Sequence, residues 1–475
     1  MSILALAPLL SVVAGALTAL LLEAFIRRRD HELSATAAIL ALAAAAYFIA
    51  RAWPLEPAYF GGRLILDALA LLLMGVFVLV AALVLLMSLA YAPLREINLG
   101  QLSGLLLLAV AGLMIMVSSK DWLIVFLGLE VLSVASYALA GLRRSDPRSR
   151  EAAAKYFLMG SFAGAFFVFG LALVFGTTGD LSFAAGVPSG AGPGGPPVTV
   201  LAGLGLIVAA LLFKIAVAPF HMWAPDVYDG APTPVTAFLT IAPKAAGLAV
   251  LLRLLWPLPV ASRAAALYIP VLSVAAVLTM FAGNLAALRQ KNIKRLLAYS
   301  AIAHSGYLLV GVIAGDGPGL VFYLVAYTFM NAGAFAILAA LSGRGEDNTT
   351  LADLSGLGRR HPWLAACLAV FLLSLAGIPP TAGFLAKFFI FSAAVARGRV
   401  LLAVAAVLAS LVSVAYYFKV IGAMYMQDAE TGPVLGKKNP ALVLAIVLCL
   451  LGIIQLGVWP GHLLVLIRQA LAGLI

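Results

Sequence analysis

The sequence predicts an all-α polytopic membrane protein with about 14 transmembrane helices. Of its 475 residues, 64% are hydrophobic and only 10% are charged, whereas soluble domains carry about 25% charged residues. Uncharged runs of roughly 20 residues, the length that spans a bilayer, recur along the whole chain. The net charge of +11 is explained by lysines and arginines in loops at the membrane surface. It therefore does not indicate nucleic-acid binding.

Apolar runs bounded by charged or turn residues mark the individual spans. The first run lacks the basic start of a signal peptide, so we expect it to be a retained helix. The predicted spans lie near 3–26, 34–50, 64–91, 102–119, 122–141, 153–176, 199–220, 234–255, 265–288, 296–315, 318–342, 363–394, 400–427 and 439–459.

The basic residues of the loops predict the orientation of these spans. With the N-terminus outside, 17 lysines and arginines fall in inner loops and 8 fall in outer ones. Inner loops of membrane proteins carry the excess of Lys and Arg. We therefore expect an even number of crossings and both termini on the outer side. The Gly- and Pro-rich segment 177–198 becomes a flexible outer loop.

Two spans are predicted to be broken. The segment that follows the seventh contains Pro219 and Pro225, and proline removes a backbone donor and clashes with the preceding turn. The twelfth span is 32 residues long, about 48 Å as a straight helix against a hydrocarbon core of about 30 Å. Its Pro379 and Pro380 predict a break there. In lipid, broken backbone is tolerated only inside protein or beside a wet cavity.

A sequence echo suggests an internal repeat. The stretch GIPPTAGFLAK (377–387) resembles GAPTPVTAFLTIAPK (230–244), and each combines a proline-rich break with a helix that carries a lysine. Paired interrupted helices in two halves of a chain point to a transport site. Because the first break lies before 230–244, the echo leaves open which segments are equivalent, and two unrelated kinks are the alternative.

Four ionisable residues inside the spans form the candidate site. Lys214, Lys244 and Lys387 interrupt apolar runs, and Glu130 lies in the middle of the fifth span. A charge at a helix centre costs about 2.5–3.5 kcal/mol on insertion scales, so such residues are usually functional. A lysine that alternately gains and loses a carboxylate partner changes its protonation state, as a proton relay requires. The alternative for Glu130 is a hydrogen-bonded structural carboxyl.

Supporting polar groups lie near these residues. His304 is in the middle of a span that also holds Tyr299, Ser300 and Tyr307, and histidine titrates near neutral pH. His221 adjoins the first break, where it could help protons to enter from inside. A histidine satisfied by core hydrogen bonds is the alternative in both cases.

Two further lysines are ambiguous. Lys155 and Lys419 lie close to the inner ends of their spans, where a lysine commonly extends its amino group to the surface. Lys155 is nevertheless kept as a supporting candidate.

No pattern in the sequence indicates a cofactor or a metal in this chain. Cys367 and Cys449 lie in apolar runs, and the five histidines are scattered. The sequence has no Walker motif, no dinucleotide-binding glycine motif and no catalytic triad. We expect the chain to perform no covalent or redox chemistry by itself.

Five segments together resemble the antiporter-like membrane subunits of respiratory complex I and their relatives in multisubunit cation/proton antiporters. Lys387, where some of those relatives are expected to carry glutamate, favours a complex I branch. The segments are LGLEVLSVASYALAG (127–141), FKIAVAPFHMWAPDVYDGAPTPVTAFL (213–239), KNIKRLLAYSAIAHSGY (291–307), DLSGLGRRHP (353–362) and SLAGIPPTAGFLAKF (374–388).

The resemblance implies two inverted five-helix repeats, spans four to eight and nine to thirteen, with broken helices 7 and 12. The implied units are an N-terminal three-helix segment, the two repeats, and a C-terminal helix with a tail, over residues 1–101, 102–260, 261–428 and 429–475. It also implies a Glu130–Lys214 pair, a central relay through Lys244 and His304, Lys387 toward the outer half, and Lys155 on the same polar axis.

The implied function is proton translocation by a non-redox subunit of an NADH:quinone oxidoreductase in a bacterial plasma membrane. NADH, FMN, iron–sulfur clusters and quinone would bind to partner subunits of the membrane and peripheral arms, and this chain would hold no cofactor. A sodium/proton antiporter subunit, a stand-alone solute transporter and a structural subunit that merely fills the membrane arm are the alternatives.

Overall fold

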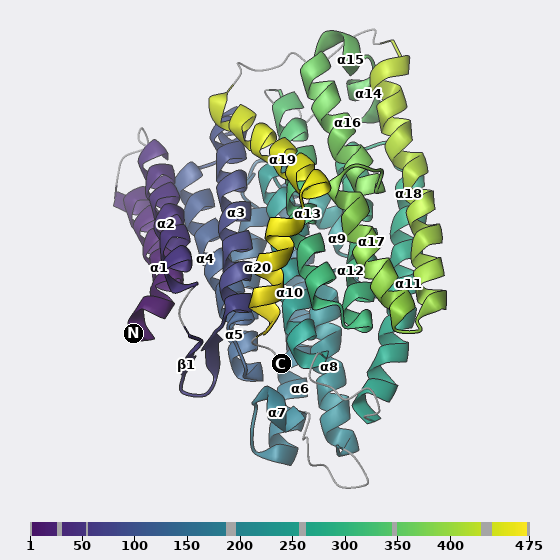
Figure 1. Cartoon of the computed structure of the whole chain (residues 1–475). Coiled ribbons are helices and arrows are strands. Elements are labelled where there is room, and N and C mark those ends of the chain that lie inside the picture. The colour runs from purple at the N-terminus through teal and green to yellow at the C-terminus, as the bar shows by residue number, and fades with distance from the viewer. Residues whose placement is uncertain are drawn as a thin grey trace.

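The computed structural model describes residues 2–25, 31–53, 56–186, 196–255, 263–343, 349–428 and 439–472. Residues 187–195 of the Gly- and Pro-rich loop that is predicted to lie outside, and the basic residues at 27–29 and 437–438, are not among the described residues. The described chain is a bundle of long helices (Figure 1), which confirms the predicted all-α membrane class.

Twelve described helices are apolar and long enough to cross a membrane. They are α1 (Ser2–Phe25), α2 (His31–Ala52), α3 (Ala68–Tyr91), α4 (Leu99–Val117), α5 (Trp122–Ala140), α6 (Pro147–Thr178), α10 (Thr233–Leu255), α11 (Arg263–Leu288), α12 (Ile293–Ala314), α13 (Gly317–Leu341), α18 (Val400–Met426) and α19 (Pro440–Val458).

The remaining elements are two interrupted helices and several short pieces. The interrupted helices are α8 (Val198–Lys214) with α9 (Ala224–Gly230), and α16 (Pro362–Ala376) with α17 (Ala382–Ala396). The short pieces are β1 (Ala58–Phe60), β2 (Leu64–Leu66), η1 (Ala92–Arg95), α7 (Phe183–Gly186), α14 (Leu351–Leu354), α15 (Leu357–Arg360) and α20 (Gly461–Ala472). The predicted breaks in the seventh and twelfth spans are therefore present.

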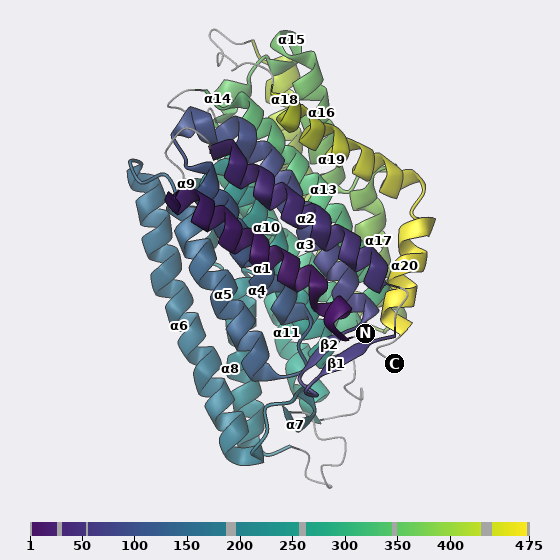
Figure 2. The ribbon, with the colours of Figure 1, turned by 90° about the vertical axis from the view of Figure 1, so that its left-hand side faces the viewer.

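The bundle is built around α10, α12 and α13, which are buried along almost their whole length. The helices α1 and α2 pack on α3 and α4 as an outer layer (Figure 2). The first turn of α1 and the last turn of α20 lie at the same end of the bundle. This placement agrees with an even number of crossings, while the total of fourteen stays a prediction.

Three boundaries differ from the sequence prediction. The third span does not begin at Leu64, because residues 64–66 form β2 and Asp67 caps α3 by accepting a hydrogen bond from the amide of Ala70. The seventh helix stops at Lys214 instead of residue 220. After α19, the chain turns at Pro460 into α20, a C-terminal helix that the apolar-run pattern did not predict.

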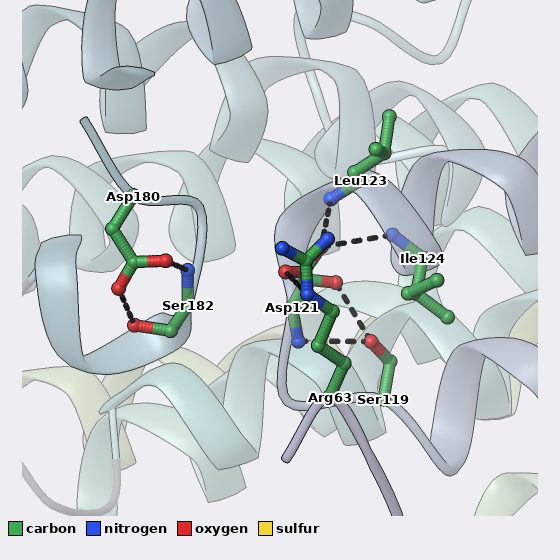
Figure 3. A network of polar contacts seen from close by, with 7 residues as sticks. All are labelled: Arg63, Ser119, Asp121, Leu123, Ile124, Asp180 and Ser182. Carbon is green, nitrogen blue, oxygen red and sulfur yellow. Dashed lines mark hydrogen bonds and ion pairs between the residues drawn. The ribbon is translucent and has the colours of Figure 1, made fainter. Parts of the chain in front are cut away.

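A paired turn closes one end of the first group of helices. The amide of Trp122 donates to the carbonyl of Leu181 at 2.8 Å, and the amide of Phe183 donates to the carbonyl of Lys120 at 2.9 Å. Asp121, between them, caps α5 (Figure 3). The turn between α4 and α5 is thus paired with the segment after α6.

Ionic and hydrogen bonds hold the β1–β2 hairpin against this turn. Arg63 Nε lies 3.6 Å from Asp121 Oδ2 (Figure 3). The amide of Lys120 donates to the carbonyl of Arg63 at 2.9 Å, and the amide of Ile65 donates to the carbonyl of Ser118 at 2.7 Å. In the neighbouring segment, the hydroxyl of Ser182 donates to Asp180 and holds the pKa of that carboxyl below its usual range.

The same arrangement recurs at the opposite end of the bundle. The amide of Ile293 donates to the carbonyl of Thr349 at 2.6 Å, and the amide of Leu351 donates to the carbonyl of Lys291 at 2.8 Å. Here Asn292 caps α12. The short helix α14 follows this turn as α7 follows the first, and the two lie at opposite ends in Figure 1. This inverted recurrence supports the repeats that the resemblance implies, whose boundaries stay a prediction.

The two helix breaks are also equivalent to each other. Each contains a residue with positive φ, Ala216 at 57° and Gly377 at 88°. A proline follows three residues later in both, Pro219 and Pro380. The break at residues 377–380 is thus equivalent to the break at 216–219, which lies before residues 230–244. The sequence similarity between 377–387 and 230–244 therefore does not mark equivalent positions.

Candidate functional site

Four predicted site residues lie deep inside the bundle. The exposed fraction is 3% for Lys214, 0% for Lys244, 1% for His304 and 5% for Lys387. None of these side chains can reach the surface to be solvated. Their hydrogen-bond partners must therefore be supplied by the protein or by ordered water.

The amino group of Lys214 is held by hydroxyl groups and aromatic rings. It donates to Ser133 Oγ at 2.9 Å and to Tyr156 OH at 3.2 Å. It also lies 5.1 Å from the ring centroid of Tyr156 and 5.8 Å from that of Tyr137. The face of an aromatic ring attracts a cation. The end of α8 is therefore built to hold an ammonium ion between α5 and α6.

Glu130 acts on Lys214 without touching it. The two side chains are both described and form no direct ion pair, because the Lys214 amino group turns to Ser133, one turn further along α5. The opposite charges nevertheless attract each other. The predicted Glu130–Lys214 pair is thus an interaction across a short gap. The Glu130 carboxylate is half-buried and faces Gly164 of α6, where a Cβ would lie 3.1 Å from it.

Lys244 occupies the centre of the bundle. Its amino group donates to the carbonyl of Ala301 in α12 and lies 5.7 Å from the ring centroid of Tyr327 in α13. One turn earlier in α10, Thr240 accepts a hydrogen bond from Asn331 Nδ2. The side chain of Lys244 therefore joins α10 to the second group of helices.

A proline next to Lys244 modifies its helix. Pro243 has no amide hydrogen, so the carbonyl of Leu239 loses its usual partner within α10. Tyr228 of α9 supplies a replacement, because its hydroxyl donates to that carbonyl at 3.3 Å. The half-helix α9 thereby contacts α10 one turn from the central lysine.

His304 lies between the two lysines of the second half of the site. Tyr323 OH is 2.8 Å from Nδ1, and Tyr417 OH is 3.5 Å from Nε2. Lys244 and Lys387 are both close enough for their charges to act on the ring. The imidazole is therefore a titratable group within electrostatic range of both lysines.

Ser300 and Tyr307, predicted as companions of His304, are also buried next to it. Ser300 Oγ lies 2.5 Å from Tyr417 OH, and the Tyr307 ring meets the imidazole edge to face at 5.6 Å. Tyr299 is half-buried and instead interacts with Arg295. The structure thus brings two of the three predicted companions to the site.

Lys387 reaches back into the second helix break. Its amino group donates to the carbonyls of Leu375 at 3.0 Å and Ala376 at 2.8 Å, and to Ser410 Oγ at 2.8 Å. The ring centroid of Tyr307 is 5.1 Å away. Carbonyls at a helix C-terminus carry partial negative charge and favour a cation. The break between α16 and α17 therefore creates the binding site for this ammonium.

Asn284 of α11 organises the surroundings of Lys387. Its Nδ2 donates to Tyr307 OH at 2.8 Å and to the carbonyl of Ala409 at 2.9 Å, while Tyr416 OH donates to Oδ1 at 3.0 Å. The side chain is fully buried. It thus fixes the ring of Tyr307 and the turn of α18 that precedes Ser410.

The two remaining predicted residues lie closer to the surface of the bundle. Lys155 contacts Asp226 Oδ2 at 2.8 Å and Glu151 Oε1 at 2.6 Å, with its side chain 41% exposed. It therefore belongs to a surface ion-pair network and not to the buried group of Lys214, Lys244, His304 and Lys387. His221 is half-buried, and among the described residues its Nδ1 has no hydrogen-bond partner.

Several residues of the site were missed by sequence reasoning. Tyrosines in apolar runs look like ordinary core residues, and a single asparagine or serine in a span gives no periodic signal. These residues are Tyr156, Asn284, Tyr323, Tyr327, Asn331, Ser410 and Tyr417. Within the described ranges, no three His, Cys, Asp or Glu side chains gather as a metal site would require.

Comparisons with known proteins agree on one family. Residues 119–413 match the family described as NADH:quinone oxidoreductase/Mrp antiporter, TM. NADH-quinone oxidoreductase subunit N of Trichlorobacter lovleyi is 42% identical over 469 residues, 97% of this chain and 95% of that protein.

Solved structures share the fold. A chain of respiratory complex I from Thermus thermophilus with bound aureothin is 34% identical, with a TM-score of 0.81 over 96% of this chain and 98% of that one. A chain of the Mrp complex from Dietzia sp. is 23% identical, with a TM-score of 0.83 over 100% and 98%. At that identity the second likeness concerns the fold alone.

Proposed function

The chain belongs to the family of NADH:quinone oxidoreductase and Mrp antiporter membrane subunits, and on this premise we propose that it translocates protons as a membrane-arm subunit of an NADH-quinone oxidoreductase. The subunit is a non-redox translocase without a cofactor of its own. NADH oxidation and quinone reduction take place in partner subunits, where NADH, FMN, iron–sulfur clusters and quinone bind.

The observation that carries the proposal is the row of buried titratable groups. Lys214, Lys244, His304 and Lys387 are each held by hydroxyl groups, carbonyls or ring faces. A buried ammonium without a bound carboxylate is costly, so each lysine can release its proton when its surroundings change.

The charge of Glu130 controls proton release from Lys214. Its carboxylate attracts the Lys214 ammonium, which itself donates a hydrogen bond to Ser133. A change in a partner subunit that weakens this attraction favours proton release from Lys214. Quinone chemistry elsewhere in the complex would cause that change.

The proton then moves outward along the row. Lys244 passes it to His304, and the imidazole accepts on one nitrogen and releases from the other. The hydroxyls of Tyr323 and Tyr417 lie beside the two nitrogens and orient the ring. Lys387 receives the proton last, at the second helix break.

The setting that fits this function is a bacterial plasma membrane. The partners are the other subunits of the membrane and peripheral arms, together with the surrounding lipid. We place both termini on the outer side, because the basic loops then lie inside. The common end shared by α1 and α20 supports the placement of both termini on one side, and the loop charges favour the outer side.

A sodium/proton antiporter subunit is the second candidate within the family. The relative that is 42% identical over nearly the whole chain carries the oxidoreductase name, whereas the Mrp chain is 23% identical. Genes for NADH- and quinone-site subunits beside this one would favour the oxidoreductase, and genes for antiporter partners would overturn it.

Replacement of Lys244 in the assembled complex tests the proposal. Methionine matches the shape of the lysine side chain and carries no charge, so Lys244→Met should assemble and lose at least tenfold in NADH-driven proton pumping. Pumping is measured as the proton gradient in inverted membrane vesicles. Lys419→Met is the matched control, because Lys419 of α18 is exposed at the surface. Unchanged pumping in Lys244→Met would reject the relay.

A further inference from the structure

Lys294 is a fourth buried lysine, which the loop pattern of the sequence assigned to the inner surface. It lies in the first turn of α12 and is only 1% exposed. Its amino group donates to the carbonyl of Ala231, the residue that ends α9. The next residue, Arg295, remains partly exposed and pairs with Asp226 at 2.9 Å. Lys294 is thus buried directly behind an ion pair that solvent reaches.

Lys294 and Lys244 lie against the same side of α12. The Lys244 amino group donates to the carbonyl of Ala301, which is seven residues after Lys294. Seven residues make two turns of an α-helix. Positions 294 and 301 therefore lie on the same face of α12, about 10.5 Å apart along its axis. The amino groups of two buried lysines therefore reach α12 or start from it about two helical turns apart.

Two threonines, Thr236 and Thr240, precede Lys244 on the same face of α10. The carbonyl of Ala231, which accepts from Lys294, also accepts from Thr236 Oγ1 at 3.4 Å. The hydroxyl of Thr240 donates to the carbonyl of Thr236 at 2.9 Å. Thr236, Thr240 and Lys244 are spaced four residues apart and so follow one face of the helix.

We propose that Lys294 is the inner loading site that supplies protons to Lys244. A proton from the inner solution binds to the neutral Lys294 amine beside the Asp226–Arg295 pair. The Lys294 ammonium then gives a proton to the chain formed by ordered water and the hydroxyls of Thr236 and Thr240. The chain gives a proton to the neutral amine of Lys244, so one proton enters and one arrives. This route rests on the proposed translocation through Lys244.

A purely structural role makes a different prediction. As a cap, Lys294 would stabilise the carbonyl end of α9 by its positive charge and its hydrogen bond to Ala231. Arginine keeps both of these properties, but its guanidinium does not deprotonate in proteins. A structural cap therefore survives Lys294→Arg, whereas a loading site does not.

The decisive experiment compares variants of the whole complex in inverted membrane vesicles. NADH:ferricyanide reductase activity and native electrophoresis report assembly, and the NADH-driven proton gradient reports pumping. We expect Lys294→Arg to assemble and to pump at least tenfold more slowly. Lys291 is exposed and lies three residues before Lys294, so Lys291→Arg should pump normally. Pumping at the wild-type rate in Lys294→Arg would overturn the loading site.

A second variant tests the route without altering a charge. Thr240→Val keeps the volume of the side chain and removes the hydroxyl, so the complex should assemble and pump more slowly. Normal pumping in Thr240→Val would exclude the route along α10. If Lys244→Met stops pumping while Lys294→Arg and Thr240→Val do not, only this inference fails. If Lys244→Met pumps normally, the proposed function fails as well.

Discussion

Lys387 fits against Gly377 across the second helix break. A Cβ at position 377 would lie 2.9 Å from Lys387 Cδ and 3.3 Å from its Nζ, and Gly377 has φ of +88°. The glycine is therefore needed both for the backbone conformation and for the space that the lysine occupies.

Gly377→Ala should weaken both the break and the position of Lys387. We expect a cost of about 1–3 kcal/mol from the backbone alone, because a residue with a Cβ is strained at this φ. The displaced lysine should also slow NADH-driven pumping. Thermal denaturation of the purified complex and the vesicle assay measure the two effects. Gly398→Ala is the control, since Gly398 also has positive φ but a Cβ there would meet no atom within 4 Å. Equal pumping in both variants would rule out the steric role.

Asn284→Leu should disturb Lys387 through its neighbours. The substitution leaves the hydroxyls of Tyr307 and Tyr416 and the carbonyl of Ala409 without the partner that Asn284 provides. Unsatisfied buried groups cost about 1–3 kcal/mol each. We expect a lower denaturation temperature and slower pumping. Ser273→Ala, which removes only a bond within α11, should change neither.

Asp67→Asn should destabilise the junction of α3 and α10. Asp67 binds Arg253 through two hydrogen bonds of 2.6 and 2.8 Å, and both side chains are buried. Asparagine still caps α3 but leaves Arg253 as an unpaired buried charge, at a cost of about 3–5 kcal/mol. The denaturation temperature of the complex measures the loss.

An exposed pair provides the comparison for the Asp67 variant. Arg359 and Asp428 form an ion pair in which both side chains are more than three-quarters exposed. Breaking such a pair costs about 0–1 kcal/mol. If Asp428→Asn lowers the denaturation temperature as much as Asp67→Asn does, burial is not the cause.

Glu130→Gln and Tyr156→Phe should separate the charge effect from the hydrogen bond at Lys214. The glutamine removes the attraction that crosses the gap, so pumping should fall at least tenfold. The phenylalanine removes one acceptor at 3.2 Å but keeps Ser133 and the ring face, so the decrease should be smaller. A larger defect in Tyr156→Phe would show that the hydroxyl, not the carboxylate, controls Lys214.

Local patterns in the sequence are sufficient to predict that the protein is a membrane protein and to identify three of its buried lysines. Apolar runs and the scarcity of charge are local properties, so they predict spans without knowledge of the fold. The prolines at 219 and 379–380 act on their own helices, which is why both breaks could be predicted. Lys214, Lys244 and Lys387 were visible because each interrupts an apolar run.

The contacts of these buried charges follow from the packing of helices that are distant in the sequence. Lys214 and Ser133 are 81 residues apart, and Lys244 and Ala301 are 57 apart, so no local pattern connects them. The structure also showed that Lys294 is buried and that Lys155 is exposed, which the position of a residue relative to a span does not reveal. Burial depends on the packing of several helices, and the chemistry of a buried lysine depends on the groups that those helices bring to it.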